Sequence, residues 1–202
     1  MPPRRGASRA AGSVACTAMV AACVAACITA CSGSQRRTAD TSRLAPTITL
    51  TSTAFQGGDS LPVTFTCDGP NHSPPLAWSG TPVRTRSLTV IVDDPDAPGG
   101  TFVHWLLYDL PGTATSLPEA VPQTATLPQL GGARQGQNDF HRAPGYDGPC
   151  PPRGAAHRYR FWIFALDTVL AVAPGAPRKE VESAMRGHEL AYAELVTHYA
   201  RR

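Results

Sequence analysis

Two short stretches of the chain place ionisable side chains directly beside apolar ones. In the first, Asp94 and Asp96 follow an apolar run, and His104 stands a few residues later between two apolar neighbours. In the second, His157 and Tyr159 occupy alternate positions where another apolar run begins. Burying such groups beside a hydrophobic core costs free energy unless they are paired. We therefore interpret the two stretches as parts of one small polar pocket.

The residue types predict the kind of ligand that this pocket would take. A neutral histidine donates from one ring nitrogen and accepts at the other, and a tyrosine hydroxyl does both. Two histidines with Tyr159, and with Tyr146 from the preceding loop, would bind a phosphate-like or carboxylate anion. Asp94 and Asp96 would then orient the histidines or receive an amine. For each residue taken singly the alternative is structural: the aspartates would cap turns, and His104 would be a satisfied core histidine. Both stretches together favour the pocket.

Catalysis has less support in the sequence than binding. Four side chains offer oxygen and nitrogen donors that could hold a metal ion in principle: Asp94, Asp96, His104 and His157. The metalloprotease pattern H-E-x-x-H, the hydrolase pattern G-x-S-x-G and a C-x-x-C pair after residue 31 are, however, absent from the sequence. We therefore predict no catalytic residue, no metal ion and no cofactor.

Three apolar runs predict the long strands that would position these residues. Residues 87–92 and 102–110 lie on either side of the acidic turn. Residues 157–167 are apolar at both alternating sets of positions from Phe161 onward, which is typical of a strand buried on both faces. Because side chains alternate along a strand, His157 and Tyr159 should point to the same face.

The other segments before residue 150 are shorter or irregular. Residues 47–53 and 61–67 predict two short strands. Residues 74–80 begin with two prolines and predict an edge strand, since proline cannot donate into a central ladder. Residues 112–146 form a long, polar and irregular connection, which in a compact domain is usually functional or mobile. Short strands with glycine and proline turns indicate a β-rich sandwich.

Helix is predicted only near the C-terminus. Residues 178–186 follow Pro177 and are followed by Gly187, a suitable C-cap. A second short helix is predicted from residue 188, because four residues recur at helical spacing: Leu190, Ala191, Leu195 and Tyr199. The predicted fold class is therefore mainly β with peripheral α.

The N-terminal residues 1–30 predict a secretory signal. Three arginines precede residue 10, and residues 10–30 carry no charge. The segment is rich in alanine and ends in I-T-A-C, which is similar to the lipobox of bacterial lipoproteins, whose cysteine is diacylated, for example with palmitate. We therefore predict lipidation at Cys31, with Cys23 and Cys27 as alternatives, and a lipidated tether over residues 31–45. A transmembrane anchor is the competing interpretation.

This signal sets the expected location and charge of the remaining domain, residues 46–202. The protein is expected on the extracytoplasmic face of the cell membrane, held by its lipid. The chain has 18 Lys and Arg against 15 Asp and Glu, and residues 1–30 hold three of the arginines and no acid, so the formal net charge after cleavage is zero. No basic stripe remains that would indicate nucleic acid as a partner.

Two cysteines, Cys67 and Cys150, remain beyond the lipidated one. Outside the cytoplasm an even pair of this kind indicates one disulfide. Two separate buried thiols are the alternative, because spacing in the sequence says nothing about distance in space. The sequence leaves both possibilities open.

Longer motifs around the candidate residues resemble one protein family. D-P-D-A-P at residues 94–98, followed by H-W, and G-P-C-P-P at residues 148–152, followed by H-R-Y, are similar to the two signatures of the phosphatidylethanolamine-binding proteins, also called Raf kinase inhibitor-like proteins. Residues 67–69 and 73–78 are similar to the bacterial branch of that family. The resemblance covers residues 47–199.

The resemblance implies both a fold and a site. The fold would be a central antiparallel sheet with a second, smaller sheet and peripheral helices, here two short C-terminal ones. The site would be a small pocket that accepts phosphoryl groups of phospholipid heads or similar anions. Pro98 and the loop that begins at Gly148 would lie at its rim. Carried over by motif, five residues would line the pocket: Asp94, Asp96, His104, His157 and Tyr159.

The predicted function is that of a non-enzymatic, membrane-anchored binding protein for a small phosphorylated or carboxylate ligand. Family members also inhibit kinases or proteases by docking, so an inhibitor of an extracytoplasmic protease or kinase is the first alternative. A metal-dependent hydrolase is the second, and the missing motifs disfavour it. The sequence does not decide the natural ligand or whether the protein dimerises.

Overall fold

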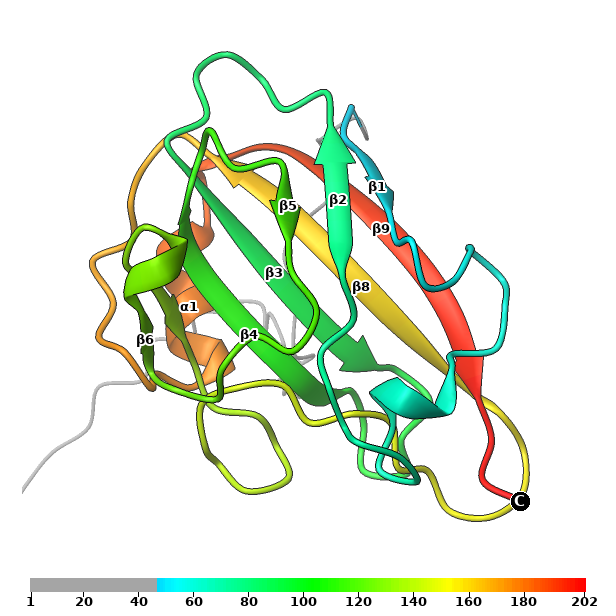
Figure 1. The fold of residues 1–202 in the computed structure, drawn as a ribbon. Coiled ribbons are helices and arrows are strands. Elements are labelled where there is room, and N and C mark those ends of the chain that lie inside the picture. Colours follow the sequence, from blue (N-terminus) through cyan, green and yellow to red (C-terminus); the bar gives the residue numbers. More distant parts are fainter. Residues whose placement is uncertain (1–46) are drawn as a thin grey trace, which may run out of the picture. The chain divides into compact units, whose positions relative to one another are not determined.

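The computed structural model describes residues 47–202, which form two antiparallel sheets and one α-helix (Figure 1). The large sheet has the strand order β6-β7-β4-β3-β8-β9, and the small sheet has the order β1-β2-β5. This arrangement confirms the prediction of a mainly β fold with a central antiparallel sheet and a smaller second one. The elements are β1 (Thr49–Thr51), β2 (Leu76–Ser79), β3 (Ser87–Asp94), β4 (Phe102–Pro111), β5 (Ser116–Leu117), β6 (Thr126–Leu127), β7 (Ala133–Gln135), β8 (His157–Leu166), α1 (Arg178–Met185) and β9 (Glu189–Tyr199).

Three strands in the middle of the large sheet are the long strands that the sequence predicts. Strand β3 pairs with β4 on one side and β8 on the other, and all of its residues are buried. A strand covered on both faces needs a nearly continuous apolar run, which is the pattern of residues 87–92. That run ends in Asp93 and Asp94, whose side chains leave the strand on opposite faces. The two acids therefore belong to different environments.

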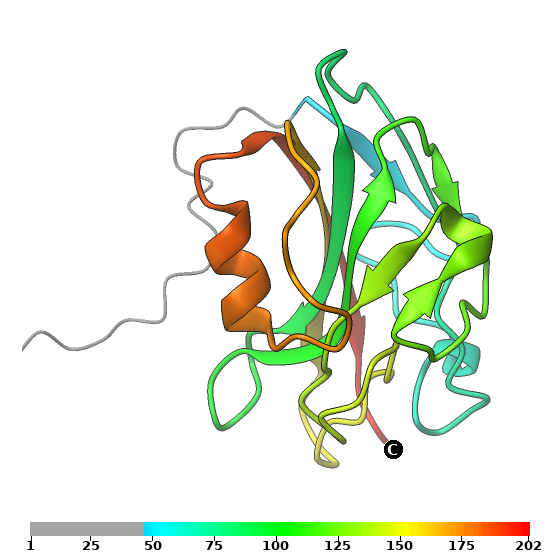
Figure 2. The ribbon, with the colours of Figure 1, turned by 90° about the vertical axis from the view of Figure 1, so that its left-hand side faces the viewer.

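The large sheet is covered on both faces by other elements (Figure 2). The small sheet packs on one face, where Leu50 and Trp78 belong to the same buried cluster as Val90 of β3. Helix α1 packs on the other face, where Val181 and Met185 are fully buried in a second cluster. The helix confirms the prediction for residues 178–186. Both faces of the central strands thus lose their contact with water, which is the main source of stability in such a layered domain.

The prediction of a second helix is wrong, because residues 189–199 form strand β9. This strand pairs with β8 along its whole length, from Tyr199 opposite His157 to Glu189 opposite Leu166. The misleading signal was the spacing of four residues between Ala191, Leu195 and Tyr199. A spacing of four puts side chains on one face of a helix, but it is also two periods of a strand, so it fits both. The long apolar strand β8 needs a partner at this edge, and tertiary pairing decides the outcome.

Two predicted short strands also differ from the structure. Residues 61–67 contain a 3-10 helix, Val63–Phe65, instead of a strand. Residues 74–80 contain β2, but this strand lies between β1 and β5 in the small sheet and is not an edge strand. The prolines at positions 74 and 75 come before the first paired residue, Leu76, so they remove no donor from the ladder.

The predicted irregular connection, residues 112–146, is more ordered than its composition suggests. It contains β5, β6 and β7, and β7 extends the large sheet by pairing with β4. The buried side chain of Gln135 holds this part in place: its oxygen accepts the indole N–H of Trp105 at 2.6 Å, and its amide nitrogen donates to the carbonyl oxygens of Pro122 and Thr124 at 2.7 Å each. A single buried amide therefore satisfies three partners from distant parts of the sequence.

The predicted secretory signal, tether and lipidated Cys31 lie outside the described residues. Over residues 47–202, the structure has no helix with the length and apolar character needed to cross a membrane.

Candidate ligand-binding site

The candidate site lies where the C-terminal end of β3 meets the N-terminal ends of β4 and β8, at the end of the sheet where several loops gather (Figure 1). Antiparallel pairing brings these three strand ends together and encloses a pocket of about 150 Å³. Four polar side chains from these strands line the pocket: Asp94, His104, His157 and Tyr159. The structure thus brings together four of the sequence-predicted residues. Its other walls are Ala97, Pro98, Phe102, Phe140, Cys150, Pro151 and Pro152.

Asp94 and His157 form a hydrogen-bonded pair at one side of the pocket. Oδ2 of Asp94 lies 2.7 Å from Nδ1 of His157, and Oδ1 accepts the backbone N–H of Asp96 at 2.8 Å. The carboxylate is 3% exposed, so both of its oxygens need such partners. A carboxylate only accepts, which means that Nδ1 of His157 carries a proton and that Nε2 is left to face a ligand.

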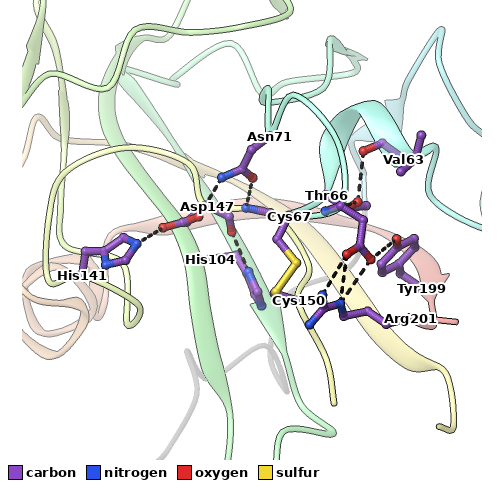
Figure 3. The surroundings of a disulfide bond; sticks show 12 residues. Val63, Thr66, Cys67, Asn71, His104, His141, Asp147, Cys150, Tyr199 and Arg201 are labelled. Atoms are coloured by element: carbon purple, nitrogen blue, oxygen red, sulfur yellow. Dashed lines mark hydrogen bonds and ion pairs between the residues drawn. A yellow bond between two sulfur atoms is a disulfide. The ribbon is translucent and has the colours of Figure 1, made fainter. Parts of the chain in front are cut away.

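His104 stands on the other side of the pocket and is held by the backbone. Its Nδ1 lies 2.6 Å from the carbonyl oxygen of Asp147 (Figure 3). Asp147 is itself fixed, because Oδ1 accepts the side-chain amide of Asn71 at 2.8 Å and Oδ2 lies 3.3 Å from Nε2 of His141. Burial lowers the pKa of His104, so its imidazole is neutral at neutral pH.

Tyr159 follows His157 by two positions on β8 and lines the same pocket. Its ring packs edge-on against His104, with 5.2 Å between ring centroids. Burial, together with the nearby charge of Asp94, raises the pKa of this hydroxyl far above its usual value, so it stays protonated. The carboxylate of Asp94 is near enough to contribute to this shift, but no group among the described residues meets the distance and angles of a hydrogen bond to the buried hydroxyl oxygen. A buried polar atom in this state is one that a ligand would satisfy.

Three predicted ligand-binding residues do not line the pocket. Asp96 turns away, and both of its oxygens bind the guanidinium of Arg158 at 2.6 and 2.9 Å. These hydrogen bonds hold the pKa of the Asp96 carboxyl well below its usual range. Tyr146 is buried in the core and donates its hydroxyl to the carbonyl oxygen of Phe65 at 2.7 Å. Each of these two side chains is hydrogen-bonded within the protein and is therefore not available to a ligand.

Gly148 is the third of these residues, and its role is close packing. Its backbone N–H donates to Oδ1 of Asn71 at 2.7 Å. A side-chain carbon at this position would lie 2.3 Å from the carbonyl oxygen of Phe65, which is a severe overlap. The residue therefore lets the loop before His157 approach the 3-10 helix, and it shapes the pocket rim only indirectly.

Two apolar wall residues escaped the sequence analysis. Phe102 stands two positions before His104 on the same strand, so the period of two could have placed it on the pocket face. Phe140 comes from the segment that was predicted as irregular. There the backbone N–H groups of Phe140 and His141 donate to Oδ1 of Asn138, which forms an Asx turn, and Phe140 then packs on Phe102 with 4.7 Å between ring centroids. No local pattern in the sequence predicts this contact between Phe140 and Phe102.

A disulfide between Cys67 and Cys150 fastens one wall of the pocket (Figure 3). The structure thereby decides between the two possibilities that the sequence left open. Cys150 lines the pocket, while Cys67 follows the 3-10 helix on the other side of the loop. The next residue, Asp68, accepts hydrogen bonds from the hydroxyl of Tyr199 at 2.7 Å and from Nε of Arg201 at 3.1 Å. The bridge and this cluster tie three separate chain segments together.

A larger and more open groove, of about 650 Å³, lies beside this cluster. Two charged residues line it, Asp68, which is already paired with Arg201, and Arg202, while the two histidines of the smaller pocket do not reach it. Convergent polar groups are a better sign of a binding site than volume alone, so we place the site in the smaller pocket. In residues 47–202 there is also no group of three or more His, Cys, Asp and Glu side chains arranged to hold a metal ion.

Comparison with known proteins gives consistent matches. The sequence model described as "Phosphatidylethanolamine-binding protein" matches residues 51–200. A UPF0098 protein of Pyrococcus horikoshii is 46% identical over 152 residues, which are 75% of this chain and 76% of that protein. A UPF0098 protein of Aquifex aeolicus is 47% identical over 152 residues, 74% of this chain and 86% of that protein.

Solved structures agree with these sequence matches. A crystal structure from Chlamydia trachomatis, described as that of a phosphatidylethanolamine-binding protein homologue, aligns with a TM-score of 0.69 at 37% identity and covers 78% of this chain and all of its own. Escherichia coli YbcL, described as a member of the mammalian family of these proteins, aligns with a TM-score of 0.71 at 34% identity, over 77% of this chain and 99% of its own.

Proposed function

The chain belongs to the phosphatidylethanolamine-binding protein family, and from this premise we propose that it binds, without catalytic turnover, the phosphoryl group of a small phosphorylated molecule or a phospholipid head. The observation that carries the proposal is the Tyr159 hydroxyl, which is buried and has no partner among the described residues. Leaving such a group unsatisfied costs about 1–3 kcal/mol. A phosphoryl oxygen in the pocket would remove that cost.

The neighbouring groups support an oxyanion in the same place. Nε2 of His157 is available to a ligand, because Nδ1 is held by Oδ2 of Asp94 at 2.7 Å, and an imidazole that carries protons on both nitrogens donates there. The pocket, at about 150 Å³, admits a small group and is too small for a drug-sized ligand, whose sites measure about 300–1,000 Å³. Phe102 and Phe140 then offer an apolar surface to the part of the ligand that follows the phosphoryl group.

Tyr159→Phe gives a selective test of this proposal. The hydroxyl makes no hydrogen bond within the described residues, so its removal should leave the free energy of unfolding unchanged or slightly higher, while phosphate affinity falls about tenfold, the equivalent of one hydrogen bond of about 1.4 kcal/mol. His157→Ala should weaken binding at least as much. Calorimetric titration with phosphate, phosphoethanolamine and acetate measures the affinities, and urea unfolding measures the stability. Unchanged phosphate affinity in both variants would exclude this pocket as the site.

Membrane attachment through Cys31 is a second part of the proposal, and it rests on the lipobox-like sequence I-T-A-C at residues 28–31. Mass spectrometry of the protein from its native membrane is expected to give a first residue Cys31 that carries acyl chains. Cys31→Ser should move the protein from the membrane fraction to the soluble fraction, whereas Cys27→Ser, the matched control, should leave it in place. An acylated Cys23 or Cys27 in the mature protein would contradict the assignment.

A further inference from the structure

The hydrogen bond of His104 fixes where its ring carries a proton. Nδ1 lies 2.6 Å from the carbonyl oxygen of Asp147, and a carbonyl oxygen can only accept (Figure 3). Nδ1 therefore carries the proton, and in the neutral ring Nε2 is an acceptor. Since His104 is 2% exposed and lines the pocket, a ligand in the pocket meets this acceptor and not a donor.

The surroundings keep the ring in this neutral state. Burial lowers the pKa of His104, and this effect outweighs the hydrogen bond to Asp147 and the negative charges nearby, which act in the other direction. Most of these charges are already paired, Asp94 with His157 and Asp147 with Asn71 and His141. The titratable groups that face the ring come from three elements: Asp94 of β3, His157 and Tyr159 of β8, and Asp147 with its partner His141 from the loops before β8. Asp93 acts on the ring only through its charge, from the other face of β3, where it is paired with Arg160 and Arg178.

Because Nε2 of His104 is an acceptor, the ligand must carry a hydrogen-bond donor at this position. A fully deprotonated oxyanion has only acceptor oxygens, and one of them would face the lone pair of Nε2 without a proton between them. Asp94 cannot supply the missing proton, because its two oxygens accept from His157 and from the backbone of Asp96. Tyr159 has one proton, which it can donate to a single oxygen. An oxyanion that carries its own hydroxyl group would donate to His104 and accept from Tyr159 and His157.

We propose that the pocket selects oxyanions that carry a proton, namely phosphate monoesters and inorganic phosphate, over sulfate esters and phosphate diesters, and that His104 determines this choice. A phosphate monoester has a second pKa of about 6, so one of its oxygens is protonated in mildly acidic solution. A sulfate ester or a diester has no such proton. The inference rests on the proposed function, since it concerns the same pocket, and it favours a monoester over the diester head of an intact phospholipid.

Methyl phosphate and methyl sulfate form a matched pair of probes. At pH 5.5 both are monoanions of nearly the same size, and they differ by the one ligand proton. Calorimetric titration of the wild-type protein is expected to give at least about tenfold tighter binding of methyl phosphate, because a site built around a hydrogen bond rejects an analogue that lacks the donor. Dimethyl phosphate, a monoanion without the proton, should bind as weakly as methyl sulfate. The affinity for methyl phosphate should fall as the pH rises above about 6, where the ligand loses its proton.

A variant of His104 tests whether this residue, and not the rest of the pocket, determines the preference for methyl phosphate. His104→Gln can turn an amide N–H towards the ligand, so the preference for methyl phosphate should shrink to about threefold or less, since the amide can donate where the imidazole only accepts. His188→Gln, which changes an exposed histidine paired with Asp167, should keep the full preference. If His104→Gln does not fold, the three ligands titrated into the wild-type protein decide the matter alone.

The possible failures are distinguishable. Equal affinities of the wild-type protein for methyl phosphate, methyl sulfate and dimethyl phosphate would overturn the selection of protonated ligands, while the proposed binding of a phosphoryl group would stand. Binding of none of these ligands, and of no inorganic phosphate, would overturn both.

Discussion

Asp93→Ala is expected to lower the free energy of unfolding by about 3–5 kcal/mol, the usual cost of breaking a buried ion pair from one side. Asp93 is fully buried, and its carboxylate accepts from Nε and one terminal nitrogen of Arg160 at 2.8 and 3.0 Å. Nη1 of Arg178 in helix α1 lies 3.1 Å away. Removing the carboxylate would leave two guanidinium groups with little access to water. Within residues 47–202 only Arg178 has a second acid partner, Glu182 at 2.5 Å.

The same chain offers a matched control in Asp96. This residue also binds an arginine of β8 through two oxygens, but the side chains of Asp96 and Arg158 are 30% and 55% exposed. Asp96→Ala should therefore cost about 0–1 kcal/mol, as exposed pairs do. Urea unfolding compares the free energies of unfolding of the two variants directly, provided that the dependence of that free energy on urea concentration has the same slope in both. Equal losses would mean that burial does not determine how much the Asp93 cluster stabilises the fold.

Asp96→Ala should also leave phosphate affinity within about twofold, because the residue lies outside the pocket. The loss of one hydrogen bond to the ligand would change the affinity by more than that.

Removing the disulfide with Cys67→Ser and Cys150→Ser together is expected to cost about 2–5 kcal/mol. The bridge joins residues 83 positions apart, so the unfolded chain gains much freedom when it is lost. Cys150 also lines the pocket, and the loop that carries it should become less fixed. Phosphate affinity of the folded variant should therefore fall as well, which calorimetry below the unfolding temperature would measure.

Reduction of the wild-type protein provides the control for this variant. Thermal unfolding with and without a thiol reductant should show a large shift in the wild type and none in the double serine variant. A wild type that unfolds at the same temperature in both conditions would show that the bridge contributes no stability. A double variant with unchanged phosphate affinity would show that the rest of the loop keeps its position without the bridge.

The parts of the fold and site that could be predicted are those with a local signal. Strands β3, β4 and β8 follow from continuous apolar runs, because a strand between two neighbours is buried on both faces. Ionisable residues at the ends of these runs marked Asp94, His104, His157 and Tyr159, which the structure brings together. Neighbouring sequence was enough here, because the meeting of strand ends is a general property of antiparallel sheets.

The parts that could not be predicted depend on partners that are distant in sequence. Strand β9 has a spacing that fits a helix as well, and its pairing with β8 decides between them. Asp96 and Tyr146 have side chains that could bind a ligand, but each has a partner within the protein. Asp96 binds Arg158, and the hydroxyl of Tyr146 donates to the carbonyl oxygen of Phe65. Phe140 reaches the pocket through a turn around Asn138. Side-chain type gives what a residue can bind, and only the three-dimensional arrangement gives what it does bind.

Strand β9 also bears on how the protein avoids aggregation, because it forms one of the two edges of the large sheet. An exposed edge presents unpaired backbone groups to which another chain could add. Part of this edge is already closed: the N–H groups of Gly58 and Leu61 donate to the carbonyl oxygens of Val196 and His198 at 2.8 Å each. Farther along the strand, the exposed Glu194 places a charge on the sheet surface beside the edge. A chain that ended before β9 would instead leave the apolar strand β8 as its edge, so this C-terminal strand protects the folded domain from pairing with other copies.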